Sequence, residues 1–148
     1  MQTSTPTVVS NQQVSEEFEQ FCFEIYQDPE TQRQVYQTPN GDSKELLHHL
    51  QSKDCRVVIL NDHPIGIFNI YDQKDEIACV GISLHPSFRG QRLAHHLLDE
   101  AEKEARLRGV MVIRADVYID NISSIKTLKA QGFREFIWLE KNLGNPNS

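Results

Sequence analysis

The sequence has few cysteines, no long apolar run and fewer basic than acidic residues. Its 148 residues include three cysteines, Cys22, Cys55 and Cys79, and no Cys-x-x-Cys pair, which argues against a disulfide framework and favours a reduced, cytoplasmic chain. No stretch of about 18 apolar residues is present, so we expect no membrane span. Residues 1–11 are polar and lack the basic flank and apolar centre of a signal peptide.

The charge balance argues against nucleic acid as a partner. Lys and Arg total 15 against 21 Asp and Glu, a formal net charge of −6, whereas binding to a phosphate backbone needs a net basic face. An acidic surface concentrates cationic small molecules, which favours a cationic substrate. The need for solubility explains the same charge equally well.

No metal is expected either. His48–His49 and His95–His96 are adjacent pairs on predicted helices, and neighbours on a helix do not face the same direction. The sequence also contains no His-Glu-x-x-His motif and no cluster of cysteine and histidine.

Hydrophobic periodicity predicts one domain over residues 1–148, with its core at about 14–143. The pattern predicts helices over residues 14–28, 42–50, 91–108 and 122–131, and strands over 56–60, 65–71, 77–84, 110–118 and 134–143. Gly109 and Gly132 are predicted to end helices, and Asn121 to cap one. The order indicates an α/β fold with a mixed, mainly antiparallel central sheet and helices on both faces.

The junction after strand 77–84 has the features of an anion site. A helix start exposes unpaired N–H groups and the positive end of the helix dipole. Gly90 allows a tight turn and a close approach to a ligand, while Arg89 and Arg92 add positive charge. A surface turn with two solvated arginines is the alternative interpretation.

Residues 84–94, Leu-His-Pro-Ser-Phe-Arg-Gly-Gln-Arg-Leu-Ala, resemble the acetyl-coenzyme A (acetyl-CoA) loop of the GNAT family of N-acetyltransferases. The family pattern is Arg or Gln, two free positions, Gly, one free position, then Gly or Ala. Arg89 and Ala94 match, but Arg92 stands at the Gly position, which is tolerable if it offers only its backbone N–H in a helical conformation. The resemblance implies acetyl-CoA contacts from Arg89, Gly90, Gln91, Arg92, Leu93, Ala94 and His95.

Two further segments are similar to the same family. Residues 121–125, Asn-Ile-Ser-Ser-Ile, with Gln-Gly-Phe at 131–133, resemble a second family signature, which implies that Asn121 and Ser124 lie beside the cofactor. Residues 64–66, Pro-Ile-Gly, resemble a hairpin of the family. The resemblance covers roughly residues 14–143 and implies a GNAT-like fold.

The resemblance also implies a mechanism. In the family the strand before the loop is bulged and splays from its neighbour, and the pantetheine arm pairs with it like an added strand. The matching residues are Ile82, Ser83 and Leu84. A backbone N–H there would polarise the thioester carbonyl, and a primary amine of a small molecule or a protein would attack directly, with no acyl-enzyme.

The proton-transfer residues are less well matched. The position of the family's base is Ala78, so we predict Glu76, two residues earlier, as the base, although a solvated turn residue is the alternative; His85 is a second candidate. The tyrosine acid of many members corresponds to Leu128, which cannot donate a proton. Tyr118, Tyr71, Ser124 or water would replace it, or the thiolate would leave unprotonated.

These departures leave a second function open, that of a weak or inactive acetyl-CoA-binding module that acts as a sensor or an interaction domain. The acceptor amine is not specified by any motif. Phe136 and Trp138 alternate in the last predicted strand, which suits core packing or a dimer face. A single last strand would leave an edge that a second subunit could cover, so a homodimer is compatible with the sequence.

Overall fold

The computed structural model describes residues 5–9, 16–34 and 55–146. In chain order the elements are β1 (Thr7–Val9), α1 (Glu16–Gln27), α2 (Pro29–Gln34), β2 (Cys55–Leu60), β3 (His63–Lys74), β4 (Ile77–Leu84), the 3₁₀ turn η1 (Pro86–Phe88), α4 (Ala94–Leu107), β5 (Val112–Arg114) and α5 (Ile122–Ala130). The helix predicted at 42–50 and the pair His48–His49 lie outside the described residues. None of the described helices has the length and apolarity that crossing a membrane requires.

The sheet has the strand order β1-β2-β3-β4-β5. Its first four strands are antiparallel neighbours, and β4 pairs with β5 in parallel. Asn61 and Asp62 join β2 to β3 with φ values of 53° and 64°, the left-handed backbone that tight hairpins need. The predicted mixed, mainly antiparallel sheet is therefore confirmed.

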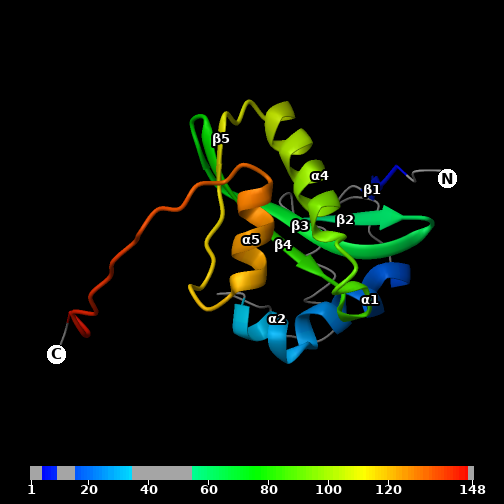
Figure 1. Cartoon of the computed structure of the whole chain (residues 1–148), viewed down its shortest axis with the longest axis horizontal. Coiled ribbons are helices and arrows are strands. Elements are labelled where there is room, and N and C mark those ends of the chain that lie inside the picture. Colours follow the sequence, from blue (N-terminus) through cyan, green and yellow to red (C-terminus); the bar gives the residue numbers. More distant parts are fainter. Residues whose placement is uncertain (1–4, 10–15, 35–54, 147–148) are drawn as a thin grey trace.

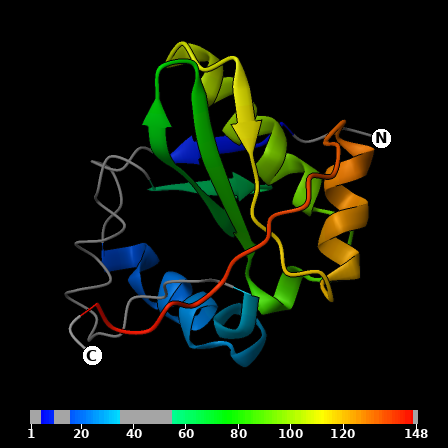
Figure 2. The same ribbon diagram turned by 90° about the vertical axis from the view of Figure 1, so that its left-hand side faces the viewer.

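Helices cover both faces of this sheet (Figure 2). On one face α4 packs Leu97, Ala101 and Ala105 against a cluster that includes Phe68 and Val80. The stripe predicted for this helix is confirmed except at Leu107, which is 83% exposed. Leu107 follows Ala105 by two residues, about 200° around the helix, and so faces away from the sheet.

The opposite face is covered by α1. Its residues Cys22, Ile25 and Tyr26 pack against Val57 and Ile67 of the sheet. Pro29 follows the end of α1, as predicted, and also begins α2, because proline suits the first turn of a helix. Asp28 precedes it and accepts a hydrogen bond from the N–H of Thr31 at 2.9 Å, as a helix cap does.

The predicted helix ends in the second half of the chain are confirmed. Gly109 (φ 77°) and Gly132 (φ 93°) adopt left-handed backbone after α4 and α5. The N–H of Val110 donates to the carbonyl of Ala105 at 3.0 Å, and that of Phe133 to Leu128 at 3.1 Å. Each helix therefore ends in a fixed direction.

The two ends of the sheet differ from prediction. No strand was predicted before residue 56, yet Thr7–Val9 pairs with β2 as β1, because Val8 and Val9 pack against the two core clusters. The strand predicted over 110–118 is reduced to Val112–Arg114. The strand predicted over 134–143 is not formed; these residues leave the body as an exposed extended segment (Figure 1), with no strand beside them in the described chain.

Candidate functional site

The site begins where β4 and β5 separate. Their pairing runs only from Ile77↔Val112 to Cys79↔Arg114, and the chain after Arg114 continues as coil towards α5 (Figure 2). The rest of β4, residues 80–84, keeps only β3 as a strand neighbour among the described residues. Ile82, Ser83 and Leu84 therefore lie on a strand with a free edge, as predicted.

The separation does not come from a bulge in this part of β4. The register between β3 and β4 is continuous from Tyr71↔Cys79 to Gly66↔Leu84, and its irregularity lies between Tyr71 and Lys74. The bulge that the family resemblance implied is thus absent from residues 79–84. The strands part because β5 ends at Arg114.

The loop after β4 is rigidly turned. The N–H of Ser87 donates to Nδ1 of His85 at 3.1 Å, and the N–H of Arg89 donates to the carbonyl of Pro86 at 3.3 Å. Gly90 then adopts a φ of 76°, and an added Cβ there would meet no atom within 4 Å. Gly90 is therefore required for its left-handed backbone conformation and not to avoid a clash. The space beside its Cα is open.

Arg92 departs from the conformation expected for it. Its φ is 58°, so its backbone is left-handed and not helical. The family pattern has Gly at this position, which has no steric penalty in this region, whereas Arg costs about 1–2 kcal/mol there. Its carbonyl lies 2.7 Å from Nδ1 of His95, an interaction that holds the strained turn against the start of α4.

The start of α4 is suited to an anion. The N-cap residue Leu93 makes no capping hydrogen bond with its side chain, and the first turn contains no acidic residue. The N–H groups of a first helical turn have no acceptor within the helix. Gln91 is held beside this turn by a bond from its Nε2 to the carbonyl of Ser87 at 3.2 Å. Backbone donors and the helix dipole thus face outward without a carboxylate to neutralise them.

The rings of His95 and His96 were predicted to diverge, but their centroids are 4.0 Å apart. Burial, and then the neighbouring His95, lower the pKa of His96. In the described part of the chain, no group of three or more potential ligands could hold a metal ion.

The side chain of Arg89 points to the helices on the other face. Its guanidinium forms an ion pair with Asp28 at 2.8 Å and donates to Oγ1 of Thr31, also at 2.8 Å. Burial raises the pKa of Asp28, but hydrogen bonds from Thr31 and Arg89 outweigh that effect and hold it below its usual value. Arg89 therefore anchors the loop to the α1–α2 junction.

A second link joins the same elements. Nε2 of His85 lies 2.6 Å from Oε2 of Glu24, and the His85 ring stacks on Phe21 at 4.9 Å. Because Nδ1 accepts from Ser87, the ring proton sits on Nε2 and points to Glu24. The hydrogen bonds from His85 and Gln20 lower the pKa of Glu24, so its carboxyl is ionised near neutral pH.

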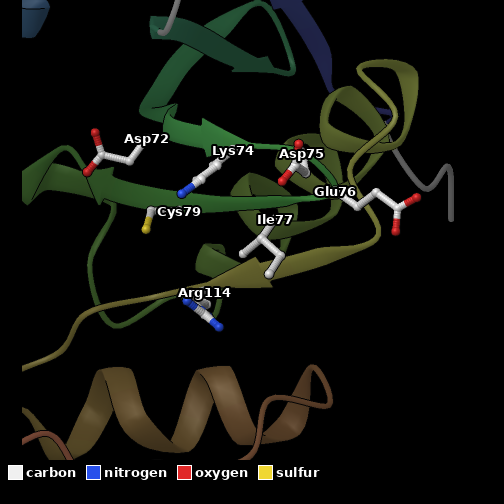
Figure 3. A pocket seen from close by; sticks show the side chains of 7 residues that line it. All are labelled: Asp72, Lys74, Asp75, Glu76, Ile77, Cys79 and Arg114. Atoms are coloured by element: carbon white, nitrogen blue, oxygen red, sulfur yellow. The ribbon is translucent and has the colours of Figure 1, made fainter.

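Glu76 lies at the other end of β4. Its carbonyl accepts hydrogen bonds from the N–H groups of Met111 and Val112 at 2.7 and 3.0 Å, and a strand rise of about 3.3 Å per residue puts it roughly 30 Å from His85. It lines an open pocket with Asp72, Lys74, Asp75, Ile77, Cys79 and Arg114 (Figure 3). The structure does not bring Glu76 together with the loop, and Ala78 is fully buried.

The second predicted segment lies near the first. Oδ1 of Asn121 accepts from the N–H of Ser124 at 3.3 Å, which caps α5 as predicted. Both views show α4 and α5 with their N-terminal ends towards the end of the sheet where β4 finishes (Figures 1 and 2). The free edge of β4 and two helix starts therefore gather at one end of the sheet.

The sequence interpretation missed the residues that hold the loop in place, Glu24, Asp28 and Thr31. A signal was present in residues 28–31, Asp-Pro-Glu-Thr, which has a capping residue followed by proline at the first helical position. Nothing local to that segment indicates that Asp28 pairs with Arg89, which lies 61 positions later in the sequence.

Comparison with known proteins agrees with this geometry. An N-acetyltransferase from Staphylococcus aureus Mu50 is 20% identical, with a TM-score of 0.71 over 87% of this chain and 83% of that one. The ribosomal-protein-alanine N-acetyltransferase of Brucella melitensis is 20% identical, with a TM-score of 0.72 over 88% and 85%. The yncA protein of Salmonella typhimurium, solved with its cofactor acetyl-CoA, is 18% identical, with a TM-score of 0.67 over 89% and 80%.

At these identities the solved structures establish the fold. No curated protein matches the chain. The family model described as "Acetyltransferase (GNAT) family" matches residues 12–133, which is most of the chain and includes both predicted signatures. The chain therefore belongs to the GNAT acetyltransferase family.

Proposed function

We propose that this protein transfers an acetyl group from acetyl-CoA to a primary amine, by direct attack of the amine and with no acyl-enzyme. The observation that carries the proposal is the free edge of β4 over residues 80–84 next to the uncapped start of α4. An extended arm that ends in a pyrophosphate fits these two features together, because one offers strand pairing and the other offers N–H donors. The yncA protein, which shares the fold, contains acetyl-CoA.

The loop residues fit the anionic part of that ligand. The left-handed turns at Gly90 and Arg92 direct the chain into α4, and the backbone of residues 90–95 would supply the donors. Gly90 has the open space that a closely approaching phosphate requires. Arg92 adds charge, whereas Arg89 acts by fixing the loop, because its side chain is bound to Asp28 and its N–H to the carbonyl of Pro86. Asn121 and Ser124 would flank the ligand from the start of α5.

Carbonyl polarisation belongs to the edge of β4. Bound acetyl-CoA supplies the acetyl group as an activated thioester. A backbone N–H among Ile82, Ser83 and Leu84 would donate to the thioester oxygen, where negative charge develops during attack. Because the donor is part of a paired strand, it needs little reorganisation, and most of the rate enhancement would come from positioning.

The amine must lose a proton before it attacks. Glu76 stays a prediction for the base, at a distance from the loop that only a chain of waters could bridge. Glu24, which contacts His85, lies at the loop itself, and we propose its carboxylate as the second candidate to take the proton, because both ring nitrogens of His85 are already hydrogen-bonded. The Glu24 carboxylate is 46% exposed, so it can also hold the acceptor as an ammonium before deprotonation.

The leaving thiolate needs no strong acid. Burial, and then Cys79 and nearby carboxylates, raise the pKa of Tyr71 to about 12, which makes that phenol a poor donor to a thiolate whose conjugate acid has a pKa of about 8.5. Leu128 cannot donate at all. We propose that the thiolate leaves unprotonated or takes a proton from water.

The acceptor is a small-molecule or protein amine, and a cytoplasmic location suits the three free cysteines. Release of free thiol from acetyl-CoA, followed across a panel of polyamines, amino sugars and N-terminal peptides, tests the proposal. Acceptor-dependent release supports an enzyme. Binding of acetyl-CoA without release for any acceptor would instead support the binding module.

A further inference from the structure

Uncovered apolar surface is concentrated in the C-terminal part of the chain. Among the described residues, every large apolar side chain that is strongly exposed lies after residue 106: Leu107, Met111, Val112, Tyr118, Ile119, Ile122, Phe136, Ile137, Trp138, Leu139 and Leu143. Monomeric proteins rarely leave large apolar patches in water, and a run of exposed apolar residues such as 136–139 points to an interface.

Four of these residues are consecutive in the extended C-terminal segment. Phe136, Ile137, Trp138 and Leu139 are 77–90% exposed. In a strand, Phe136 and Trp138 would point to one face and Ile137 and Leu139 to the other. A strand that is apolar on both faces is typical of a covered position in a sheet.

The sheet has an open edge that such a strand would fill. β5 is the last strand in the order, and no described strand pairs with its outer side. Met111 and Val112, at its start, are 76% and 48% exposed. An uncovered edge of this kind offers a row of backbone donors and acceptors to another strand.

The exit from α5 directs the segment away from its own sheet. Gly132 (φ 93°) and the bond from the N–H of Phe133 to Leu128 fix the turn. Lys129 then holds Glu135 by an ion pair at 2.7 Å, and the guanidinium of Arg134 lies 4.9 Å from the ring of Phe136. Figure 1 shows the segment running outward from this turn, away from the body.

We propose that two copies of this chain form a dimer by exchanging this segment, so that residues 134–143 of each copy pair as a strand with the β5 edge of the other. One chain contains both parts of the contact: the open edge of β5 and the unpaired segment 134–143. A two-fold axis satisfies them reciprocally and closes the assembly. The occupant of the edge is therefore a second copy of this chain, and the inference does not depend on the proposed acetyl transfer.

Sedimentation equilibrium on the full chain tests the dimer. The expected mass is twice 17.1 kDa at micromolar concentration. The double variant Ile137→Lys/Trp138→Lys should be a monomer that still unfolds cooperatively in thermal melts. Leu107→Lys replaces an equally exposed leucine outside the segment and the edge, and should remain a dimer. A monomeric wild type, or a dimeric double variant, would overturn the proposal.

Cross-linking tests the exchange itself. In a Cys79→Ser background, one chain carries Val112→Cys and a differently tagged chain carries Trp138→Cys, and a short bismaleimide is added to the mixture. Products that contain both tags are expected, and their yield should fall at least tenfold when Ile137→Lys is added to the second chain. If instead a chain carrying both cysteines cross-links only within itself, the segment folds onto its own edge and the exchange is refuted.

Discussion

Arg89 and Asp28 form an ion pair at 2.8 Å that links the loop after β4 to the junction of α1 and α2. The guanidinium also donates a hydrogen bond to Thr31. One side chain of the loop thus binds two residues at the junction of α1 and α2. An arginine that the family pattern associates with the cofactor loop thus acts here as a positioning residue. Its side chain fixes the loop, and its N–H donates to the carbonyl of Pro86 within the same turn.

Replacing Asp28 with Asn should remove the charge of this link but keep the helix cap, because Asn caps as well as Asp. We expect a loss of about 1 kcal/mol in unfolding free energy at neutral pH, the upper range for a partly exposed pair. The folded protein lowers the Asp28 pKa, so this stabilisation is complete above the unfolded pKa of about 4 and disappears as pH falls through the lower folded value.

Denaturant titrations at pH 7 and pH 3 measure this difference. Glu102→Gln is the matched control, because it breaks the more exposed pair with Arg106 on α4. Equal stability of Asp28→Asn and the wild type at pH 7 would show that the link contributes nothing.

Replacing Arg92 with Gly should stabilise the protein. Arg92 holds a left-handed backbone with φ 58°, and relief of its strain outweighs the added flexibility of Gly by about 0.5–1 kcal/mol. Thermal melts would show a higher Tm. Gln91→Gly, at the preceding position, is the control and should lower the Tm. A lower Tm for Arg92→Gly as well would contradict the claim that the backbone of Arg92 is strained.

Replacing Gly66 with Ala should destabilise the end of β4. An added Cβ would lie 2.5 Å from the carbonyl oxygen of Ser83 and 2.9 Å from Cδ1 of Leu97, so the strands or α4 must shift. Overpacking of this kind costs about 1–3 kcal/mol. Gly109→Ala serves as a comparison, since it adds strain without a clash. Wild-type stability and wild-type acetyl-CoA affinity in Gly66→Ala would contradict the close packing.

Kinetics should separate the two candidate bases. If the contact between His85 and Glu24 serves the acceptor, Glu24→Gln lowers kcat/KM at least tenfold, within the range for general-base groups, and leaves acetyl-CoA affinity unchanged. Glu76→Gln is the paired variant at the far end of β4. If only Glu76→Gln lowers kcat/KM, Glu76 is the base, as the sequence predicted, and the contact between Glu24 and His85 is not required.

Much of this architecture follows from local sequence signals. The strands from Cys55 to Leu84, the long helix α4 and the caps at Gly109, Asn121 and Gly132 depend on periodicity and turn chemistry within a few residues. The predictions that failed concern segments whose structure depends on residues distant in the sequence. β1 forms only because β2 is there to pair with it, and the predicted strand 134–143 pairs with no strand among the described residues.

In the candidate site, too, some features follow from local sequence and others depend on the tertiary fold. The turn at Gly90 and the start of a helix after it were predicted from local sequence signals, and anion binding by residues 89–94 stays a prediction. The direction of the Arg89 side chain could not be predicted in this way, because Asp28 and Thr31 reach it only through the tertiary fold. The left-handed conformation of Arg92 could be suspected only from the glycine that the family pattern has at that position.

Acetyl-CoA binding by the folded chain tests the central claim most directly. Isothermal titration calorimetry should give a micromolar dissociation constant for the wild type, about −8 kcal/mol. It should give no detectable binding for Gly90→Asp, which adds strain at φ 76° and a negative charge beside the start of α4. Failure of the folded wild type to bind acetyl-CoA, or equal binding by Gly90→Asp, would contradict the account.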